Sequence, residues 1–179
     1  MKAILKYPGS KWRIADWVIS FFPEHHSYLE PFFGSGATFF RKKMSNIETI
    51  NDLDGEVMNF FEWVRRDPER LARAIYLTPY SRQVYDAAFT LAENNFDAAV
   101  KFFIQANMGY GFRTAGARAG WKFDIQGRER AYSRNDWNEL PERIVFAAER
   151  LKDVQIEGEP ALDVIGRFNF KNVLIYCDP

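Results

Sequence analysis

Four short segments that contain glycine or acidic residues supply the residue types that a nucleotide-like ligand needs. The first, LEPFFGSGA at 29–37, has the composition of a strand that leads through Gly34 and Gly36 into a helix. Glycines at such a turn let the backbone approach a ligand closely, and a helix N-terminus offers free N–H groups to a carboxylate or phosphate. The same turn is also a common structural connection, so this segment needs support from elsewhere in the chain.

An acidic segment, NDLD at 51–54, gives that support. Asp52 stands at the end of the next predicted strand, where a carboxylate can accept hydrogen bonds from ribose hydroxyls. Helix capping is the alternative for both acids, and Asp54 is predicted to cap the following helix. The third glycine of a GxGxxG motif is absent because Phe39 stands at that position. This favours a nucleoside without pyrophosphate over NAD, and makes a Rossmann-type oxidoreductase the more distant alternative.

Two further segments lie near the ends of the sequence. IYCDP at 175–179 places Asp178 at the carboxyl end of a late predicted strand, the end where open α/β sheets bind ligands. A carboxylate there could equally cap a following helix. KYPGSK at 6–11 places two lysines and a flexible turn before the first predicted helix, and by its residue types alone it is an N-terminal loop.

Hydrophobic periodicity predicts the elements that would position these residues. Helical spacing predicts helices over 10–22 with Ser10 as a cap, after Asp54, and over 81–93, 96–107, 140–152 and 160–167. Strands are predicted at 27–33, 47–51, 154–157 and 172–177, the last as a central strand buried on both faces. This alternation predicts a mainly parallel α/β sheet in 1–66 and 136–179, with 67–135 as an inserted subdomain.

Composition sets limits on the class of protein. The 179 residues are 47% hydrophobic and carry a formal net charge of zero, which favours a packed core and requires any nucleic-acid contact to be a local patch. The lone Cys177 excludes an internal disulfide, and the adjacent His25 and His26 suit a metal poorly, so no metal site is predicted. The sequence shows no signal-peptide core and no membrane-spanning run, which predicts a cytoplasmic protein without membrane contact.

The order and spacing of KYPGSK, EPFFGSGA, NDLD and YCDP resemble the D12, or alpha, class of DNA adenine-N6 methyltransferases, its phage and bacterial members above all. The similarity extends through TPYSR at 78–82, GWKFD at 120–124 and the run at 140–157. The resemblance implies a Rossmann-like sheet that uses S-adenosylmethionine, with a helical target-recognition insertion. It also implies the transfer of a methyl group to adenine N6 in double-stranded DNA.

The resemblance assigns roles to individual residues. The residues that it assigns to cofactor binding are Tyr7, Lys11, Glu30, Phe32, Gly34, Gly36, Asp52 and Asp178. Among them, Asp52 is assigned to the ribose hydroxyls. Catalysis falls to Asp178 and Pro179, which begin the family's Asp-Pro-Pro-Tyr motif. The second proline, the tyrosine and the C-terminal strands of the family are not in the sequence.

That departure leads to expectations about activity. We expect little or no turnover from this chain by itself, and an open sheet edge that favours self-association or a second chain. The alternative is a non-catalytic fragment that binds cofactor or DNA, or one half of a complemented enzyme.

DNA contact is predicted for 109–134, which is rich in glycine and aromatic residues. Its basic residues are Arg113, Arg118, Lys122, Arg128, Arg130 and Arg134. Such a stretch suits phosphate contact and base readout, and the corresponding region of the resembled family inserts into DNA. The alternative is a solvated loop whose aromatic residues are anchored in the core.

Charge reversal of Arg113 or Arg118 tests this stretch. We expect weaker duplex binding and a flatter dependence of the binding constant on salt, by about one unit of slope per lost phosphate contact. Fluorescence anisotropy of a labelled duplex over a salt series measures both quantities. A residue that reads a base would instead relax sequence preference at one position, and unchanged affinity and slope would identify an ordinary loop.

Overall fold

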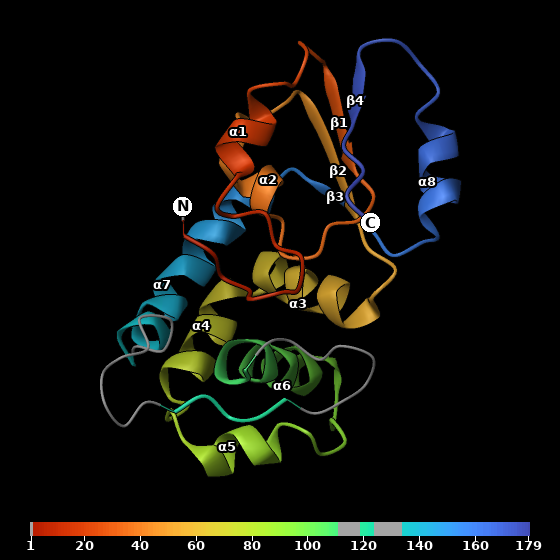
Figure 1. The fold of residues 1–179 in the computed structure, drawn as a ribbon. Coiled ribbons are helices and arrows are strands. Elements are labelled where there is room, and N and C mark those ends of the chain that lie inside the picture. Colours follow the sequence, from red (N-terminus) through yellow and green to blue (C-terminus); the bar gives the residue numbers. More distant parts are fainter. Residues whose placement is uncertain (1, 111–118, 124–133) are drawn as a thin grey trace.

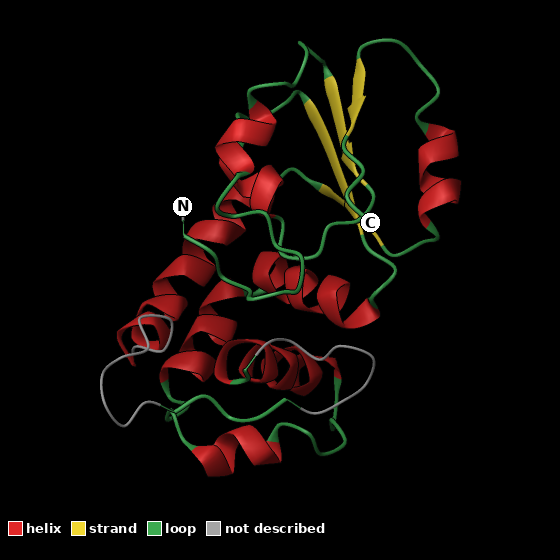
Figure 2. Ribbon diagram, in the orientation of Figure 1, coloured by secondary structure: helices red, strands yellow, loops and turns green. Residues whose placement is uncertain are grey.

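The computed structural model describes residues 2–110, 119–123 and 134–179, without the side chains of 134 and 135. Its elements are α1 (Ala15–Ile19), β1 (Ser27–Glu30), α2 (Ala37–Arg41), β2 (Ile47–Asn51), α3 (Gly55–Arg66), α4 (Pro68–Tyr76), α5 (Arg82–Ala87), α6 (Asn95–Met108), α7 (Arg134–Leu151), β3 (Gln155–Glu157), α8 (Ala161–Arg167) and β4 (Val173–Ile175). The strands gather in one half of the molecule, and helices make up most of the other half (Figure 2).

The sheet is parallel in every pairing and has the strand order β3-β2-β1-β4. β1 lies in the middle, where Ser27 pairs with Ile47 of β2 on one side and with Val173 of β4 on the other. Helices α1 and α2 lie on one side of the sheet and α8 on the other (Figure 1). The parallel α/β sheet that the sequence predicts is confirmed.

One hydrophobic core joins the sheet to the helices. Its buried side chains include Tyr28 and Ile50 from the sheet, Phe103 from α6 and Leu140 from α7. Helix α4 packs along α7, and α6 packs along α3, in the most extensive of the helix–helix contacts. Elements of the predicted insertion 67–135 therefore share a core with the sheet-bearing segments, and the division into two subdomains stays a prediction.

The first predicted helix is wrong in its bounds and in its cap. Helix α1 covers only Ala15–Ile19, and Ser10 forms a hydrogen bond with Ser35 instead of capping a helix. The residues from Lys11 to Ile14 form a turn, closed by the bond from the Ile14 N–H to the Lys11 carbonyl. The apolar spacing predicted a buried helix face, yet 64% of the Trp17 surface and 68% of the Phe21 surface are exposed.

Other bounds differ for local reasons. No helix was predicted between 67 and 80, yet Asp67 caps α4 by accepting from the Arg70 N–H, with Pro68 in the first turn. Helix α7 begins at Arg134 and accommodates Pro141, and α5 ends at Ala87, short of the predicted 93.

The predicted strand at 172–177 is shorter and less buried than expected. β4 spans Val173–Ile175, its residues are half-buried, and it forms one edge of the sheet within the described residues. The prediction of a strand buried on both faces is therefore wrong for this structure. Association with a second chain at this edge stays a prediction.

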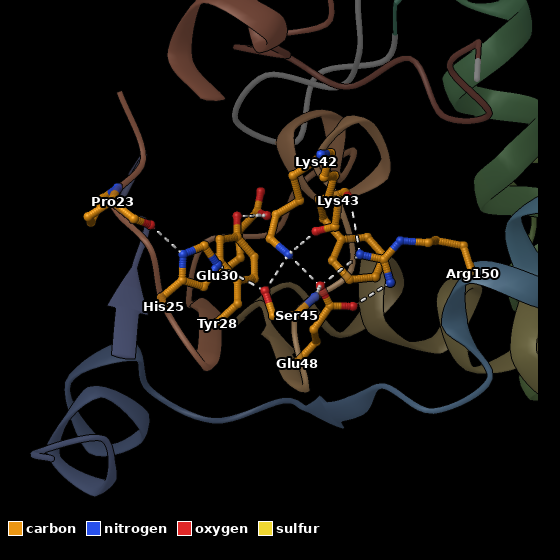
Figure 3. Close-up of polar contacts among 10 residues, drawn as sticks. Pro23, His25, Tyr28, Glu30, Lys42, Lys43, Ser45, Glu48 and Arg150 are labelled. Atoms are coloured by element: carbon orange, nitrogen blue, oxygen red, sulfur yellow. Dashed lines mark hydrogen bonds and ion pairs between the residues drawn. The ribbon is translucent and has the colours of Figure 1, made fainter. Parts of the chain in front are cut away.

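A buried network of charged side chains connects the sheet to α7 (Figure 3). The Lys42 ammonium donates to the Lys43 carbonyl and to Ser45 Oγ, both at 2.8 Å, and forms an ion pair with Glu48. The Arg150 guanidinium contacts both oxygens of Glu48. Burial opposes ionisation of Glu48, but hydrogen bonds from Arg150 and Lys42 outweigh it and lower the pKa of Glu48.

Removal of Glu48, the acid that Lys42 and Arg150 share, should lower the stability of the fold. Glu48→Ala leaves two cations without their anion, so we expect the free energy of unfolding to fall by about 3–5 kcal/mol near neutral pH in urea denaturation. The exposed Glu149→Ala on α7 is the control and should change it by less than about 0.5 kcal/mol.

The pH dependence supplies a second readout for Glu48. Because its folded-state pKa is lowered, its stabilisation is complete above the unfolded value of about 4.3 and is lost as pH falls through the folded value. The difference between wild type and Glu48→Ala should therefore shrink in acid. A difference that is absent at neutral pH, or equally large at both pH values, would contradict a role for this charge.

Candidate functional site

A cavity of about 220 Å³ lies at the carboxyl edge of the sheet. Its walls come from the N-terminal segment, the β1–α2 loop, the residue after β2 and the segment after β4. The residues predicted for cofactor binding and catalysis that line it are Tyr7, Lys11, Glu30, Phe32, Gly34, Asp52, Asp178 and Pro179. Gly36 is the one member of the predicted set that does not line the cavity. The structure thus brings together residues from four distant parts of the sequence.

The β1–α2 loop depends on its glycines. Gly34 and Gly36 have φ values of 49° and 65°, in the left-handed region that favours glycine. A Cβ on Gly36 would lie 2.4 Å from the Phe33 ring and 2.9 Å from the Phe40 ring. A Cβ on Gly34 would lie 3.2 Å from the Tyr7 ring, which packs over the loop. Gly36 therefore shapes the cavity through the loop without facing it.

Asp52 joins this loop to the end of β2. Its carboxylate accepts the Gly34 N–H at 2.7 Å and the Asp54 N–H at 2.9 Å. Burial raises the pKa of Asp52 despite these two hydrogen bonds. Each carboxylate oxygen has a second lone pair, so the side chain still has acceptor capacity toward the cavity.

Asp54 caps α3, as predicted, by accepting the Glu56 N–H at 2.9 Å. It also accepts the Tyr7 hydroxyl at 3.1 Å. Burial and the nearby carboxylates raise the pKa of Tyr7, so this tyrosine stays a neutral donor. The cap of α3 therefore fixes the tyrosine ring that covers Gly34.

Lys11 and Asp178 close the other side of the cavity. The Lys11 ammonium lies 2.8 Å and 2.7 Å from the two carboxylate oxygens of Asp178, and donates to the Gly9 carbonyl at 2.8 Å. The Tyr176 hydroxyl donates to the same carboxylate at 3.4 Å. The N-terminal turn thereby holds the orientation of the predicted catalytic acid.

Glu30 is the most deeply buried acid of the cavity, with 3% of its surface exposed. The Tyr28 hydroxyl donates to it at 2.6 Å. Burial raises the pKa of Glu30 to about 8, against the opposing effects of the Tyr28 hydrogen bond and the positive charge of Lys42. A large part of the Glu30 population is therefore protonated near neutral pH.

The sequence interpretation missed several residues that line the cavity. Ser10 and Ser35 face each other with their hydroxyl oxygens 2.7 Å apart, and Thr38 and Tyr176 complete the wall. Both serines lie inside the motifs already singled out, so attention to their polar positions would have found them. Tyr28 stands two residues before Glu30, and strand periodicity places such a pair on the same face.

The predicted DNA-binding residues are mostly outside the described part of the chain. Arg113, Arg118, Arg128 and Arg130 lie there, and the side chain of Arg134 is not described. Lys122 is described and is buried, with its pKa lowered to about 8 by burial and by the charge of Lys6. Because Lys122 is buried, its position does not support the predicted contact with a phosphate. Arg82, which is not among the predicted DNA-binding residues, places its guanidinium over the Trp121 and Phe123 rings.

Comparison with known proteins gives the class of this chain. Residues 7–179 match the family model of the D12 class N6 adenine-specific DNA methyltransferases. The chain belongs to this family. The predicted resemblance to the D12 class is confirmed over almost the whole sequence. The parallel sheet with its flanking helices is the fold of an S-adenosylmethionine-dependent methyltransferase.

A relative with a known assignment is the DNA N-6-adenine-methyltransferase of Escherichia phage P1. It is 26% identical over 133 residues, which cover 62% of this chain and 18% of that protein. The chain therefore matches less than a fifth of the length of that relative.

Membership in the D12 family implies a methyl donor, generally S-adenosylmethionine. The cavity offers the classes of partner that such a molecule needs. It combines three carboxyl groups, on Glu30, Asp52 and Asp178, with the rings of Phe32 and Tyr176. A donor with cationic groups, ribose hydroxyls and a purine ring needs these classes of partner.

Among the described residues, no helix has the length and apolar character to cross a membrane. Nor does the described part of the chain contain a group of three or more His, Cys, Asp or Glu residues that could hold a metal ion.

Gly36 offers a direct test of the loop. Gly36→Ala should reduce the free energy of unfolding by about 2–4 kcal/mol, because it combines an unfavourable φ with a clash against the Phe33 ring. The exposed Gly166→Ala in α8 meets nothing within 4 Å and should stabilise by about 0.5–1 kcal/mol. Thermal and urea unfolding compare the two, and the same sign for both would refute this account of Gly36.

Proposed function

We propose that this chain binds S-adenosylmethionine in the cavity at the carboxyl edge of the sheet and directs its methyl group to adenine N6 in double-stranded DNA. One observation carries the proposal: the residues that match the D12 motifs converge on one cavity although they are spread from Tyr7 to Pro179. The family match over residues 7–179 supports the reaction class.

Each wall of the cavity would meet a different part of the methyl donor. Asp52 would accept the ribose hydroxyls with the lone pairs that its backbone bonds leave available. The turn at Gly34 would let the backbone approach the ligand closely. Tyr7, which packs on that turn, and Lys11, which holds Asp178, would close the site from the N-terminal side.

The chemistry requires an adenine amine in an unusual electronic state. Its lone pair is delocalised into the ring, so the free amine is a poor nucleophile. In the proposed arrangement, the Asp178 carboxylate and the Pro179 carbonyl accept its two N–H bonds, which directs the lone pair out of the ring plane. The bound donor supplies a methyl group made electrophilic by its attachment to a sulfonium.

The reaction then forms a bond from N6 to the methyl carbon while the bond from that carbon to sulfur breaks. One amine proton leaves to solvent. The protein contributes position and electrostatics, since in-line attack requires the amine and the methyl group to be held together. Lys11 serves this step indirectly, because its ion pair fixes the carboxylate that receives the amine.

We assign the contact with DNA to the segment 109–134, within the proposed insertion 67–135. The sequence there combines arginines with aromatic residues, which suits phosphate binding and the extrusion of a base from the duplex. In this arrangement an extruded adenine would approach Asp178, which lines the cavity.

Asp52 tests the cofactor site. Asp52→Asn keeps the shape of the side chain but replaces one acceptor oxygen with a donor, so we expect binding of S-adenosylmethionine to weaken by about 1.5–3 kcal/mol. Isothermal titration calorimetry measures the affinity, and the exposed Asp163→Asn on α8 is the control. Because Asp52 also holds the Gly34 loop, urea unfolding must show that the variant is folded under the conditions of titration. Equal affinities in folded variant and wild type would remove Asp52 from the ribose site.

A further inference from the structure

Residues 119–123 form a short segment between α5 and α6 (Figure 1). An antiparallel bridge joins Trp121 to Gly109, the residue that follows α6. On the other side, the hydroxyl of Tyr85 in α5 donates to the Ala119 carbonyl at 2.6 Å. These two contacts hold the backbone of the segment in place between the helices.

Arg82, the first residue of α5, lies over two rings of this segment. The Trp121 and Phe123 rings are stacked, with centroids 5.7 Å apart and planes inclined by 12°. The central carbon of the Arg82 guanidinium lies 4.8 Å from the centre of the Trp121 ring and 5.4 Å from that of Phe123. Both distances are within the range of about 6 Å over which a cation is attracted to an aromatic face. The rings therefore restrict where this guanidinium can lie.

The edge of the Arg82 guanidinium still has its hydrogen-bond donors. The side chain is exposed, and no hydrogen bond or ion pair with another described residue includes it. Contact with a ring occupies the face of a guanidinium, whereas its five N–H groups point outward from the edge. That edge forms a fork that matches two oxygens of one phosphate or carboxylate. Arg82 is thus arranged to bind an anion that approaches from solvent.

The position of Arg82 indicates which anion this is. Tyr110 and Phe123 expose 43% and 42% of their surfaces, and both belong to the segment 109–134 that we assign to DNA contact. Double-stranded DNA carries one negative charge per about 1.7 Å of its axis. A duplex that contacts these rings would bring backbone phosphates within reach of the guanidinium that lies over Phe123.

We propose that Arg82 binds a backbone phosphate of the DNA duplex, with its guanidinium oriented by the rings of Trp121 and Phe123. This inference rests on the proposed function, because it takes double-stranded DNA as the substrate. A phosphate contact fixes the position of the duplex and carries no sequence information. Because the rings already restrict the side chain, it loses less conformational freedom when it binds. Helix α5 thereby supplies an anchor for DNA that lies outside the segment 109–134.

Arg70 offers a matched control on another part of the molecule. Its side chain is also exposed, and its guanidinium carbon lies 4.1 Å from the centre of the Phe96 ring and 5.4 Å from that of Trp63. Phe96 lies in the first turn of α6, whereas Gly109 follows the last residue of that helix. At 1.5 Å per residue, the two arginine sites are therefore separated by roughly 20 Å along α6.

Duplex binding over a salt series tests the proposal, with fluorescence anisotropy of labelled DNA and the full chain. Arg82→Gln should weaken binding about tenfold at low salt, because it removes a charged hydrogen bond. It should also reduce the slope of the logarithm of the binding constant against the logarithm of salt concentration by about 0.9, as for one phosphate contact. Two duplexes of different sequence should lose the same factor. Arg70→Gln should change neither affinity nor slope.

Two further variants test the orientation by the rings. Arg82→Lys keeps the charge but lacks the planar fork, so the salt slope should persist while affinity falls about threefold. Phe123→Leu removes one ring, and binding should weaken about threefold in the wild-type background and remain unchanged in the Arg82→Gln background. A merely structural ring, or one that touches DNA itself, would weaken binding equally in both backgrounds and refute the positioning role.

The outcomes separate this inference from the proposed function. Thermal unfolding checks that each variant is folded, and affinity for S-adenosylmethionine should stay unchanged because Arg82 does not line the cavity. If Arg82→Gln loses no more affinity or slope than Arg70→Gln, the contact is refuted and DNA binding by 109–134 stands. A loss confined to one of the two duplexes would assign Arg82 to a base edge instead. If the folded wild-type chain binds no duplex, the DNA part of the proposed function fails together with this inference.

Discussion

The parallel pairing of β1 with both β2 and β4 determines where the chemistry of this chain can lie. In parallel strands the carboxyl ends share one edge of the sheet, so whatever follows β1, β2 and β4 is brought together there. The Glu30 end of β1, Asp52 and Asp178 meet at the cavity for this reason. The N-terminal segment completes the enclosure with its turn and with the ion pair between Lys11 and Asp178.

Much of this arrangement was predictable because its signals are local. The alternation of strands and helices gave the parallel sheet, and the glycines at 34 and 36 gave a turn whose φ values only glycine adopts readily. Asp54 was identified as a helix cap from its position before an apolar period, and it is one. The bounds of β2 were predicted to the residue because β-branched residues occupy a largely buried strand that pairs with a neighbour on each side.

The remaining features depend on partners far away in the sequence. The ion pair between Glu48 and Arg150 joins β2 to α7, and periodicity within either segment carries no information about it. The apolar residues of α1 have the spacing of a buried helix face, yet Trp17 is largely exposed. The roles of the site residues stay predictions, although the cavity places the matching residues together.

The long sequence separation across β1 has a consequence for how the molecule acquires its structure. Ser27 pairs with Val173, and Lys11 with Asp178, so the central strand and the cavity are completed by residues that are synthesised long after β1. Contacts between distant residues slow folding, because a long loop must close before the contact contributes any stabilisation. The helices α3, α4 and α6 can pack on one another earlier, since their partners are close in sequence. A nascent chain would therefore hold a helical scaffold while β1 still lacks one neighbour, and the cavity would form after that scaffold.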